Sequence, residues 1–316
     1  VFIFPFAKNI SIISCLSILL LSTIALKGQS AGIADSIFNP LDLGFGNGDG
    51  ASDWIRATEI QPDGKVLVGG FFHLYNGEPR RGIVRLNSDG SIDTTFLGPG
   101  FNFGSYIHAI ALLPNGKILV GGTFTSYNGS AISNFIRLNS DGTRDLSYNI
   151  GTGPNSNVYS IKVLSTGKVL IGGDFTSIAG VAKARLARLD STGFVDATFN
   201  AGLGPSSTVT TIDTYTDGRI VIGGNFTSVD TTVVPRIARL LVDGAVDTLF
   251  DVGAGFNDYV NKVKVLSDNK LLIAGNFFQY KGLYVPGLVR LYDNGNRDIT
   301  FLVTQAQFTG DFETFV

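Results

Sequence analysis

The sequence predicts an all-β fold, a β-propeller built from four-stranded antiparallel blades, and three observations support this class. One unit is copied in tandem five times, at an interval of about 51 residues. The unit carries a double glycine after an apolar strand, then an Arg-Leu pair, then an Asp-x-x-Phe motif. A period near fifty with strand-like content is typical of propellers. Beyond residue 30, no stretch shows the apolar spacing of an amphipathic helix, so no helix is expected there.

The markers of the unit shift together along the chain, which shows that one unit was copied whole. The second glycine of the pair stands at Gly70, Gly122, Gly173, Gly224 and Gly275. The arginine stands at Arg85, Arg137, Arg188, Arg239 and Arg290. An aspartate follows eight residues later, at Asp93, Asp145, Asp196, Asp247 and Asp298. The complete repeat units therefore run roughly over 54–96, 106–148, 157–199, 208–250 and 259–301.

The elements of one blade can be read from the third unit, 157–199. Its first strand, at 158–163, contains few helix formers, and a Thr-Gly turn joins it to a second strand at 168–171. Three other units have Asp-Gly or Asn-Gly in this turn, and these pairs accept the positive φ angles of a tight hairpin. The third strand is 186–189, and the Asp-x-x-Phe piece at 196–199 is the fourth.

The double glycine is expected to let neighbouring blades approach closely, because a side chain there would hold the backbones apart. A phenylalanine follows the second glycine at a fixed offset in every unit. We expect these rings to fill the space between adjacent blades rather than to stack on a ligand. They are Phe72, Phe124, Phe175, Phe226 and Phe277.

The repeated arginine lies in an apolar strand and needs a partner, because an unpaired buried charge is very costly. The aspartate eight residues later is predicted to pair with it in the same blade, as Arg85 with Asp93. The aspartate of the next blade is an equally periodic alternative. A ring of arginines that binds an anion is a further hypothesis, but a matched carboxylate would remove most of the positive potential.

The chain is not expected to hold a metal ion or a cofactor. The loop 87–93 resembles a calcium loop, but it has too few carboxylates, and later copies lose several of its polar residues. A turn capped by its own side chains explains the loop without a metal. Cys15 is the only cysteine of the chain. A mature chain lacking it would form neither disulfides nor thiolate metal sites.

The first thirty residues differ in kind from the repeats. Lys8 precedes an uncharged apolar run over 10–26, and small residues follow. This pattern predicts a signal peptide at 1–30, and therefore a secreted or cell-surface protein. An uncleaved membrane anchor through residues 10–26 is the alternative. The segment 12–15 also loosely matches a lipoprotein processing site.

Charge and hydropathy exclude two kinds of partner. The chain has 24 Lys and Arg against 26 Asp and Glu, and removal of Lys8 and Lys27 would leave 22 against 26. Because there is no basic stripe, no nucleic acid partner is expected. No second apolar run is long enough to cross a bilayer, so no membrane span is expected in the mature chain. Partners are instead expected to be an extracellular protein or a carbohydrate.

Both ends of the chain suggest a fragment of a longer repeat protein. Residues 308–316 resemble the start of a further unit, and a copy of the fourth-strand motif stands alone at 35–38. If that copy completes the last blade, the whole protein has at least six blades. A five-bladed ring that closes within residues 31–316 is the competing arrangement.

The order Asp-Gly-Lys, hydrophobic strand, Gly-Gly-x-Phe, Arg-Leu, Asp-Gly and Asp-x-x-Phe resembles the delta-60 repeat of bacterial β-propeller proteins. The resemblance covers about 35–301. It implies a secreted or surface-exposed bacterial protein, often large and multidomain, and it implies no catalytic residues. Kelch repeats share the double glycine but usually add a Tyr and a Trp per unit. This chain has a single tryptophan, Trp54, which argues against that family.

A site that performs a specific task must break the repeat symmetry. The first unit departs most from the others and supplies binding candidates at Trp54, Arg56, His73, Glu78 and Arg80. A second set is the variable column on the first strands, which would face the central channel. It contains Glu59, Ala111, Lys162, Asp213 and Lys264.

Three functional hypotheses follow. The first is a secreted or cell-surface β-propeller that acts as a non-catalytic binding or display module. The second is a glycan-active hydrolase or lyase that uses Glu59 and Asp213 as a carboxylate pair across the channel. The third is a structural segment of a larger surface protein. No Ser-His-Asp arrangement, metal cluster or phosphate loop is recognisable in the sequence.

Overall fold

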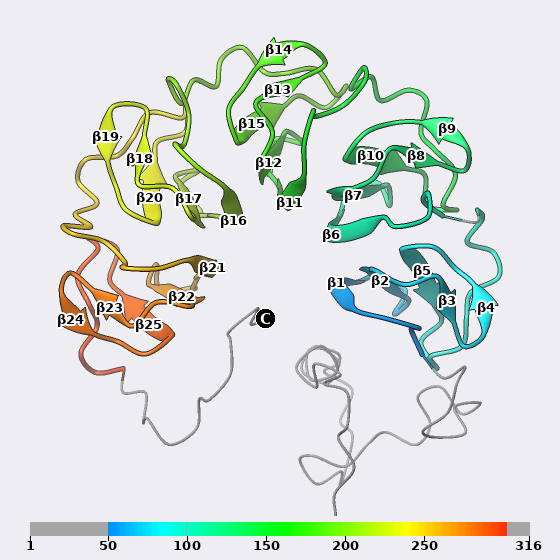
Figure 1. Cartoon of the computed structure of the whole chain (residues 1–316), viewed down its shortest axis with the longest axis horizontal. Helices are drawn as coiled ribbons and strands as arrows, with labels where there is room; N and C mark the ends of the chain where they lie inside the picture. The colour runs from blue at the N-terminus through cyan, green and yellow to red at the C-terminus, as the bar shows by residue number, and fades with distance from the viewer. Residues whose placement is uncertain (1–49, 99, 302–316) are drawn as a thin grey trace, which may run out of the picture.

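The computed structural model describes residues 50–98 and 100–301, which form five blades placed in an arc around a common centre (Figure 1). All regular elements of these residues are β-strands, and neighbouring strands within each blade are antiparallel. The predicted fold class is therefore confirmed. The predicted signal peptide at 1–30, the lone motif at 35–38 and the start of a further unit at 308–316 lie outside the described residues.

The first strand of each blade lies nearest the centre, and the second pairs with it on the outer side (Figure 1). The first strands are β1 (Ile55–Ile60), β6 (Tyr106–Leu112), β11 (Val158–Val163), β16 (Val209–Thr214) and β21 (Val260–Val265). The second strands are β2 (Val66–Gly70), β7 (Ile118–Thr123), β12 (Val169–Gly173), β17 (Ile220–Gly224) and β22 (Leu271–Gly275). The five first strands contact one another in series around the centre.

The third strands complete a three-stranded sheet in every blade. They are β5 (Ile83–Leu86), β10 (Phe135–Leu138), β15 (Leu186–Leu189), β20 (Ile237–Leu240) and β25 (Leu288–Leu291). Between the second and third strands, the chain forms a small outer hairpin that the sequence did not predict. The hairpins are β3–β4 (Leu74–Tyr75, Glu78–Pro79), β8–β9 (Ser126–Tyr127, Ser130–Ala131), β13–β14 (Ser177–Ile178, Val181–Ala182), β18–β19 (Ser228–Val229, Thr232–Val233) and β23–β24 (Gln279–Tyr280, Leu283–Tyr284).

The expected fourth strand is reduced to one bridge residue in each blade. In the third blade, Val195 pairs with Leu189, and the chain then turns at Asp196 instead of continuing as a strand. The Asp196 carboxylate explains the turn, because its Oδ1 accepts the backbone N–H of Thr198 at 3.0 Å and the hydroxyl of Thr198 at 2.7 Å. Such side-chain capping offers the backbone an alternative to a sheet ladder.

The two glycines of each pair have different structural roles. A Cβ at the first glycine of the third blade, Gly172, would lie 2.6 Å from the Val209 side chain of the next blade. A Cβ at Gly173 would lie 1.9 Å from the carbonyl oxygen of Asn157 in its own blade. Only the first glycine therefore permits the close approach of blades that the sequence predicted. The second permits a close backbone contact next to the irregularity in the first strand.

The core is continuous from blade to blade. The second strands are almost fully buried, and the phenylalanine two residues after each second glycine is at most 2% exposed. Large apolar clusters join residues of successive blades, such as Val209 of the fourth blade with Leu170 of the third. Within the described residues, no helix is long and apolar enough to cross a membrane.

The two faces of the arc carry different parts of the repeat. The first strands begin and the second strands end on one face, which we call the upper face; Trp54 and Phe71 lie on it. The Asp-Gly turns that follow the first and third strands lie on the opposite, lower face. There, the two turns of one blade meet, since a Cβ at Gly64 would lie 3.6 Å from the Cβ of Ser88.

Candidate functional site

The repeated arginine and aspartate form an interblade clasp rather than a ligand site. In the third blade, the Nε of Arg188 donates to Asp196 Oδ2 at 2.7 Å, which is the predicted within-blade pairing. A second guanidinium nitrogen donates to the carbonyl oxygen of Val242 in the next blade at 2.5 Å. Lys168, from the Asp-Gly-Lys type of turn, donates to the same Asp196 oxygen at 2.8 Å. Both cations of the clasp, Arg188 and Lys168, therefore bind the single carboxylate of Asp196.

Four of the five clasps lower the pKa of their aspartates. Burial alone would raise the pKa of Asp196, but hydrogen bonds from Lys168, Thr198 and Arg188 outweigh it and hold that pKa well below its usual range. Three further clasp aspartates show the same direction, namely Asp93, Asp145 and Asp298. In the fourth blade, Arg219 replaces the lysine and pairs with Asp217 and Asp293 instead.

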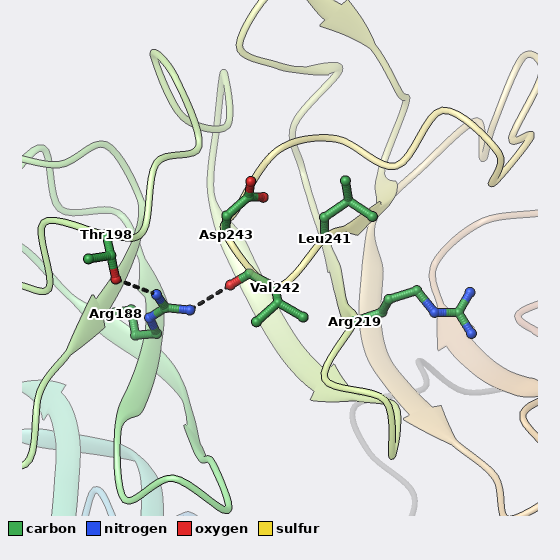
Figure 2. Close-up of a pocket in the computed structure, with 6 residues that line it drawn as sticks. All are labelled: Arg188, Thr198, Arg219, Leu241, Val242 and Asp243. Carbon is green, nitrogen blue, oxygen red and sulfur yellow. Dashed lines mark hydrogen bonds between the residues drawn. The ribbon is translucent and has the colours of Figure 1, made fainter.

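A pocket of about 470 Å³ opens between the third and fourth blades on the lower face. Figure 2 shows Arg188 bonded to Thr198 of its own blade and to the Val242 carbonyl of the next blade, with Arg219 on the far side of Val242. Both arginines already make ion pairs with aspartates of the propeller. Most polar groups of the lining belong to the repeated clasp, and the lining residues that depart from the repeat are Arg219, Leu241 and Val242.

The upper face, by contrast, presents a different set of side chains in each blade. Three columns change from copy to copy. The first, directly before the residue that pairs with the second glycine, contains Trp54, Tyr106, Asn157, Thr208 and Tyr259. The second, two residues later, contains Arg56, His108, Tyr159, Thr210 and Asn261. The third, directly after the second glycine, contains Phe71, Thr123, Asp174, Asn225 and Asn276.

The first two blades bring aromatic rings together in what we call the aromatic patch: Trp54, Phe71, His73, Phe103 and Tyr106. Phe71 stacks on Tyr106 with centroids 4.1 Å apart, and His73 stacks on Phe103 at 4.3 Å. The edge contact between Phe71 and His73, at 5.4 Å, joins the two stacks. Phe103 is 74% exposed and Trp54 is 59% exposed. The other three rings of the patch are half-buried.

Trp54 lies beside Phe71, because its carbonyl oxygen accepts the Phe71 N–H at 2.8 Å. The Arg56 guanidinium lies 5.1 Å from the centre of the Trp54 ring. Cation–π contact of this kind holds the arginine against the ring face. The sequence candidates Trp54, Arg56 and His73 thus lie in or next to one patch.

Polar side chains continue the upper face from the second to the fourth blade. The Thr123 hydroxyl donates to Asn157 at 2.8 Å, and the Asn157 amide donates to the Tyr159 hydroxyl at 2.8 Å. Tyr159 in turn donates to Asp174 at 2.7 Å, and Thr208 donates to the other Asp174 oxygen. Networks that cross blade boundaries fix their side chains in place.

His108 links the aromatic patch to this polar network. Its Nε2 lies 3.2 Å from the Thr123 hydroxyl, and its ring meets that of Tyr159 edge-on at 4.8 Å. Burial and the positive charge of Arg56 lower the pKa of His108 to about 4, so it is neutral at physiological pH. Burial and the bond to Asp174 raise the pKa of Tyr159 to about 12.

The inner strands bring charged side chains toward the centre. Lys162 pairs with Asp213 of the next blade, with Nζ 2.5 Å from Oδ1. Asp213 also accepts the backbone N–H groups of Thr214 at 2.9 Å and Val265 at 2.8 Å. Both carboxylate oxygens of Asp213 are therefore engaged.

Glu59, the other acid of the predicted catalytic pair, lies in the same electrostatic environment. Burial raises the pKa of its carboxyl above the ordinary value, although three lysines oppose the shift. These lysines are Lys262, Lys264 and Lys162. The charges that act on Glu59 thus come from Lys162 and Lys264 of its own sequence column and from Lys262.

Two candidates from the first unit lie elsewhere. Glu78 belongs to the exposed outer hairpin, on β4, and Arg80 follows it at the rim of the blade, where its guanidinium donates to the Pro79 carbonyl at 2.7 Å. Most residues of the aromatic patch and its polar extension were not predicted from the sequence: Phe71, Phe103, Tyr106, His108, Tyr159 and Asp174. The variability directly after the double glycine is the signal that could have found Phe71 and Asp174.

These features define a repeat β-propeller whose upper face is specialised while its clasps are constant. A model of the β-propeller domain of unknown function DUF5122 matches 61–96, 113–148, 164–199, 216–250 and 266–301. The matches together cover more than half of the 316 residues, and the chain belongs to this family. No curated protein matches the chain.

Solved structures show the same fold at low identity. The extracellular domain of a candidate one-component system from B. thetaiotaomicron aligns at 14% identity and a TM-score of 0.53, over 85% of this chain and 30% of that one. The extracellular domain of a hybrid two-component system from the same organism aligns at 16% identity and 0.49, over 86% and 30%. This chain therefore spans about a third of the length of those two domains.

Another similar structure is that of an enzyme. An inactive variant of virginiamycin B lyase from Staphylococcus aureus aligns at 14% identity and a TM-score of 0.48, over 80% of this chain and 70% of that one. Since identities this low show the fold alone, the function must be argued from the residues of this chain.

Proposed function

We propose that this chain is a non-catalytic binding module, secreted or displayed at the cell surface, and that it binds carbohydrate on the aromatic patch of the upper face. The proposal rests chiefly on the stacked rings of two blades, which end in the exposed ring of Phe103, with the exposed Trp54 next to them in the chain fold. The repeat does not require the central ring of the patch, Phe71, since its equivalents in the other blades are Thr123, Asp174, Asn225 and Asn276. A binding role accounts for the exposure of Phe103 and Trp54.

Carbohydrate is the favoured ligand class because the patch adjoins fixed polar groups. A sugar presents an apolar C–H face and a rim of hydroxyls. The exposed Phe103 ring, stacked on His73, and the Trp54 ring can contact the apolar face of the sugar. The network of Asn157, Tyr159 and Asp174 adjoins the patch and can bind the hydroxyls of the sugar.

Location outside the cell rests on the resemblance to the delta-60 repeat and on the predicted signal peptide at 1–30. The alternative of an anchor through residues 10–26 would also place the propeller outside the membrane. Both arrangements would expose the upper face to extracellular glycans.

A glycan-active enzyme using Glu59 and Asp213 is the less favoured function. The raised pKa of Glu59 suits a general acid. Asp213, however, is bound by Lys162 and by two backbone N–H groups, so it is poorly placed to act as a base or nucleophile. We therefore assign no catalytic pair.

The test is an array of bacterial and host polysaccharides probed with the full chain, followed by calorimetry on the glycan that binds best. Phe103→Ala and Trp54→Ala should each weaken that binding about tenfold or more, because exposed aromatic anchors dominate such sites. Phe194→Ala is the matched control, since Phe194 is 55% exposed but follows a turn of the lower face.

Equal affinities in all three variants would contradict the proposed site. If the chain binds a protein and this binding depends on Phe103, the role as a binding module stands and the assignment to carbohydrate is wrong. Turnover of a polysaccharide that is lost in Glu59→Gln would overturn the non-catalytic assignment.

A further inference from the structure

The five inner strands concentrate positive charge at the centre of an acidic chain. Lys162, Lys262 and Lys264 act on the Glu59 carboxyl there, and Lys162 also pairs with Asp213. Three lysines against two acids leave an excess of one positive charge, whereas the whole chain carries a net charge of −2. A concave surface with an excess of one sign of charge raises the local concentration of oppositely charged ligands.

The excess positive charge lies on the fifth blade. Lys162 is matched by Asp213, whose Oδ1 lies 2.5 Å from its Nζ. Among the described residues, no carboxylate lies within ion-pair distance of Lys262 or Lys264 on β21. Two neighbouring lysines without a matched acid repel one another, so this arrangement favours a bound anion.

Lys262 is also a departure from the repeat. The equivalent residues in the other blades, each paired with the first glycine, are Ala57, Ala109, Ser160 and Thr211. A half-buried lysine in a column of small residues is not required by packing. Its pKa is lowered by burial and by the charge of Lys264, which together outweigh the opposing charges of Asp213 and Glu59.

We propose that Lys262 and Lys264 bind the anionic group of a ligand at the centre of the propeller, a carboxylate or a phosphate. Glu59 shares this electrostatic environment and opposes the bound anion with its own negative charge. Loss of the Glu59 charge therefore strengthens binding. The site is independent of the aromatic patch, because a simple anion needs no apolar surface.

The experiment is calorimetry on the full chain with three probes: inorganic phosphate, an oligogalacturonate and the methyl ester of the same oligosaccharide. Lys262→Gln and Lys264→Gln should each weaken anion binding about tenfold, the effect of losing one charge-assisted hydrogen bond. Lys264 is exposed, so its replacement leaves the fold intact even if Lys262→Gln does not. Lys183→Gln is the control, because Lys183 donates to the Phe199 carbonyl away from the centre.

Glu59→Gln should strengthen binding several-fold, and raised salt should weaken it. Binding of oligogalacturonate without phosphate or ester assigns the site to a carboxylate, and binding of phosphate alone assigns it to a phosphate group. Equal binding of the ester, or unchanged affinity in both lysine variants, overturns the proposal. Variants of Trp54 or Phe103 that still bind phosphate would show that the anion site does not depend on the aromatic patch.

Discussion

The clasp arginine makes four kinds of contact, and each explains why this residue type is repeated. In the first blade, Arg85 donates to Asp93, to Thr95 and to the Ser140 carbonyl of the next blade, and it lies 4.8 Å from the Phe96 ring centre. Lysine could not make these contacts together, because only a guanidinium presents several donors in a fixed plane. The clasp therefore serves two blades at once.

Removal of a clasp aspartate should destabilise the third blade more than the fourth. Asp196→Asn leaves Arg188 without its buried counter-charge and should lower the free energy of unfolding by about 3–5 kcal/mol. Asp247→Asn should cost less, because Arg239 keeps Asp293, whose Oδ1 lies 2.8 Å from its guanidinium. Urea unfolding of both variants measures the difference, and equal losses would contradict the role given to Asp293.

At the scale of single residues, the sequence predicts constant contacts and misses variable ones. The pairing of Arg85 with Asp93 follows from a fixed spacing within one unit. The stack of His73 on Phe103 does not, because the two residues belong to different parts of the repeat and meet only after the chain turns between blades. A period reveals what all copies share, whereas a site is made of what they do not share.

At the scale of the blade, the two glycines of each pair are required by two different close contacts. At the first position a Cβ would meet side chains of the next blade, which can shift; at the second it would meet a backbone carbonyl, which cannot shift without moving a strand. The fifth blade has Ala274 at the first position. In every blade the second position is glycine.

Alanine at the two glycines of the third blade should therefore have unequal effects. Gly172→Ala should cost about 1–3 kcal/mol of unfolding free energy, the usual cost of overpacking. Gly173→Ala should cost more, because the added Cβ would lie 1.9 Å from the Asn157 carbonyl oxygen. Thermal unfolding compares the two. If Gly172→Ala is less stable than Gly173→Ala, the contact between blades tolerates an added Cβ less well than the backbone contact within the blade.

The elements of the blade were also only partly predictable. Hairpin turns and apolar strands identify the first three strands, whereas Asp-x-x-Phe was expected to be a fourth. The capping bonds that Asp196 accepts from Thr198 convert it into a turn after one bridge. The outer hairpins escape prediction because their strands have two residues each, too few to show a period.

At the scale of the whole molecule, the clasps should make the propeller sensitive to acid. Four clasp aspartates have pKa values held well below the usual one. Their stabilisation is present above the unfolded aspartate value of about 3.9 and is lost as the pH falls below it, since the unfolded chain takes up protons first. Unfolding free energies measured from about pH 6 to pH 2 should decline below about pH 4. A flat profile would contradict the lowered pKa values.

The molecule as a whole combines a constant frame with one specialised surface. Trp54 is the only tryptophan of the chain, it is exposed, and it lies in the aromatic patch. Its fluorescence therefore reports on the proposed glycan site without labelling. The most direct measurement is a titration of Trp54 emission with the polysaccharide that binds best. If glycan binds on the aromatic patch, Trp54 emission changes saturably with the affinity found by calorimetry. Binding in the calorimeter that leaves Trp54 emission unchanged would show that the glycan binds elsewhere.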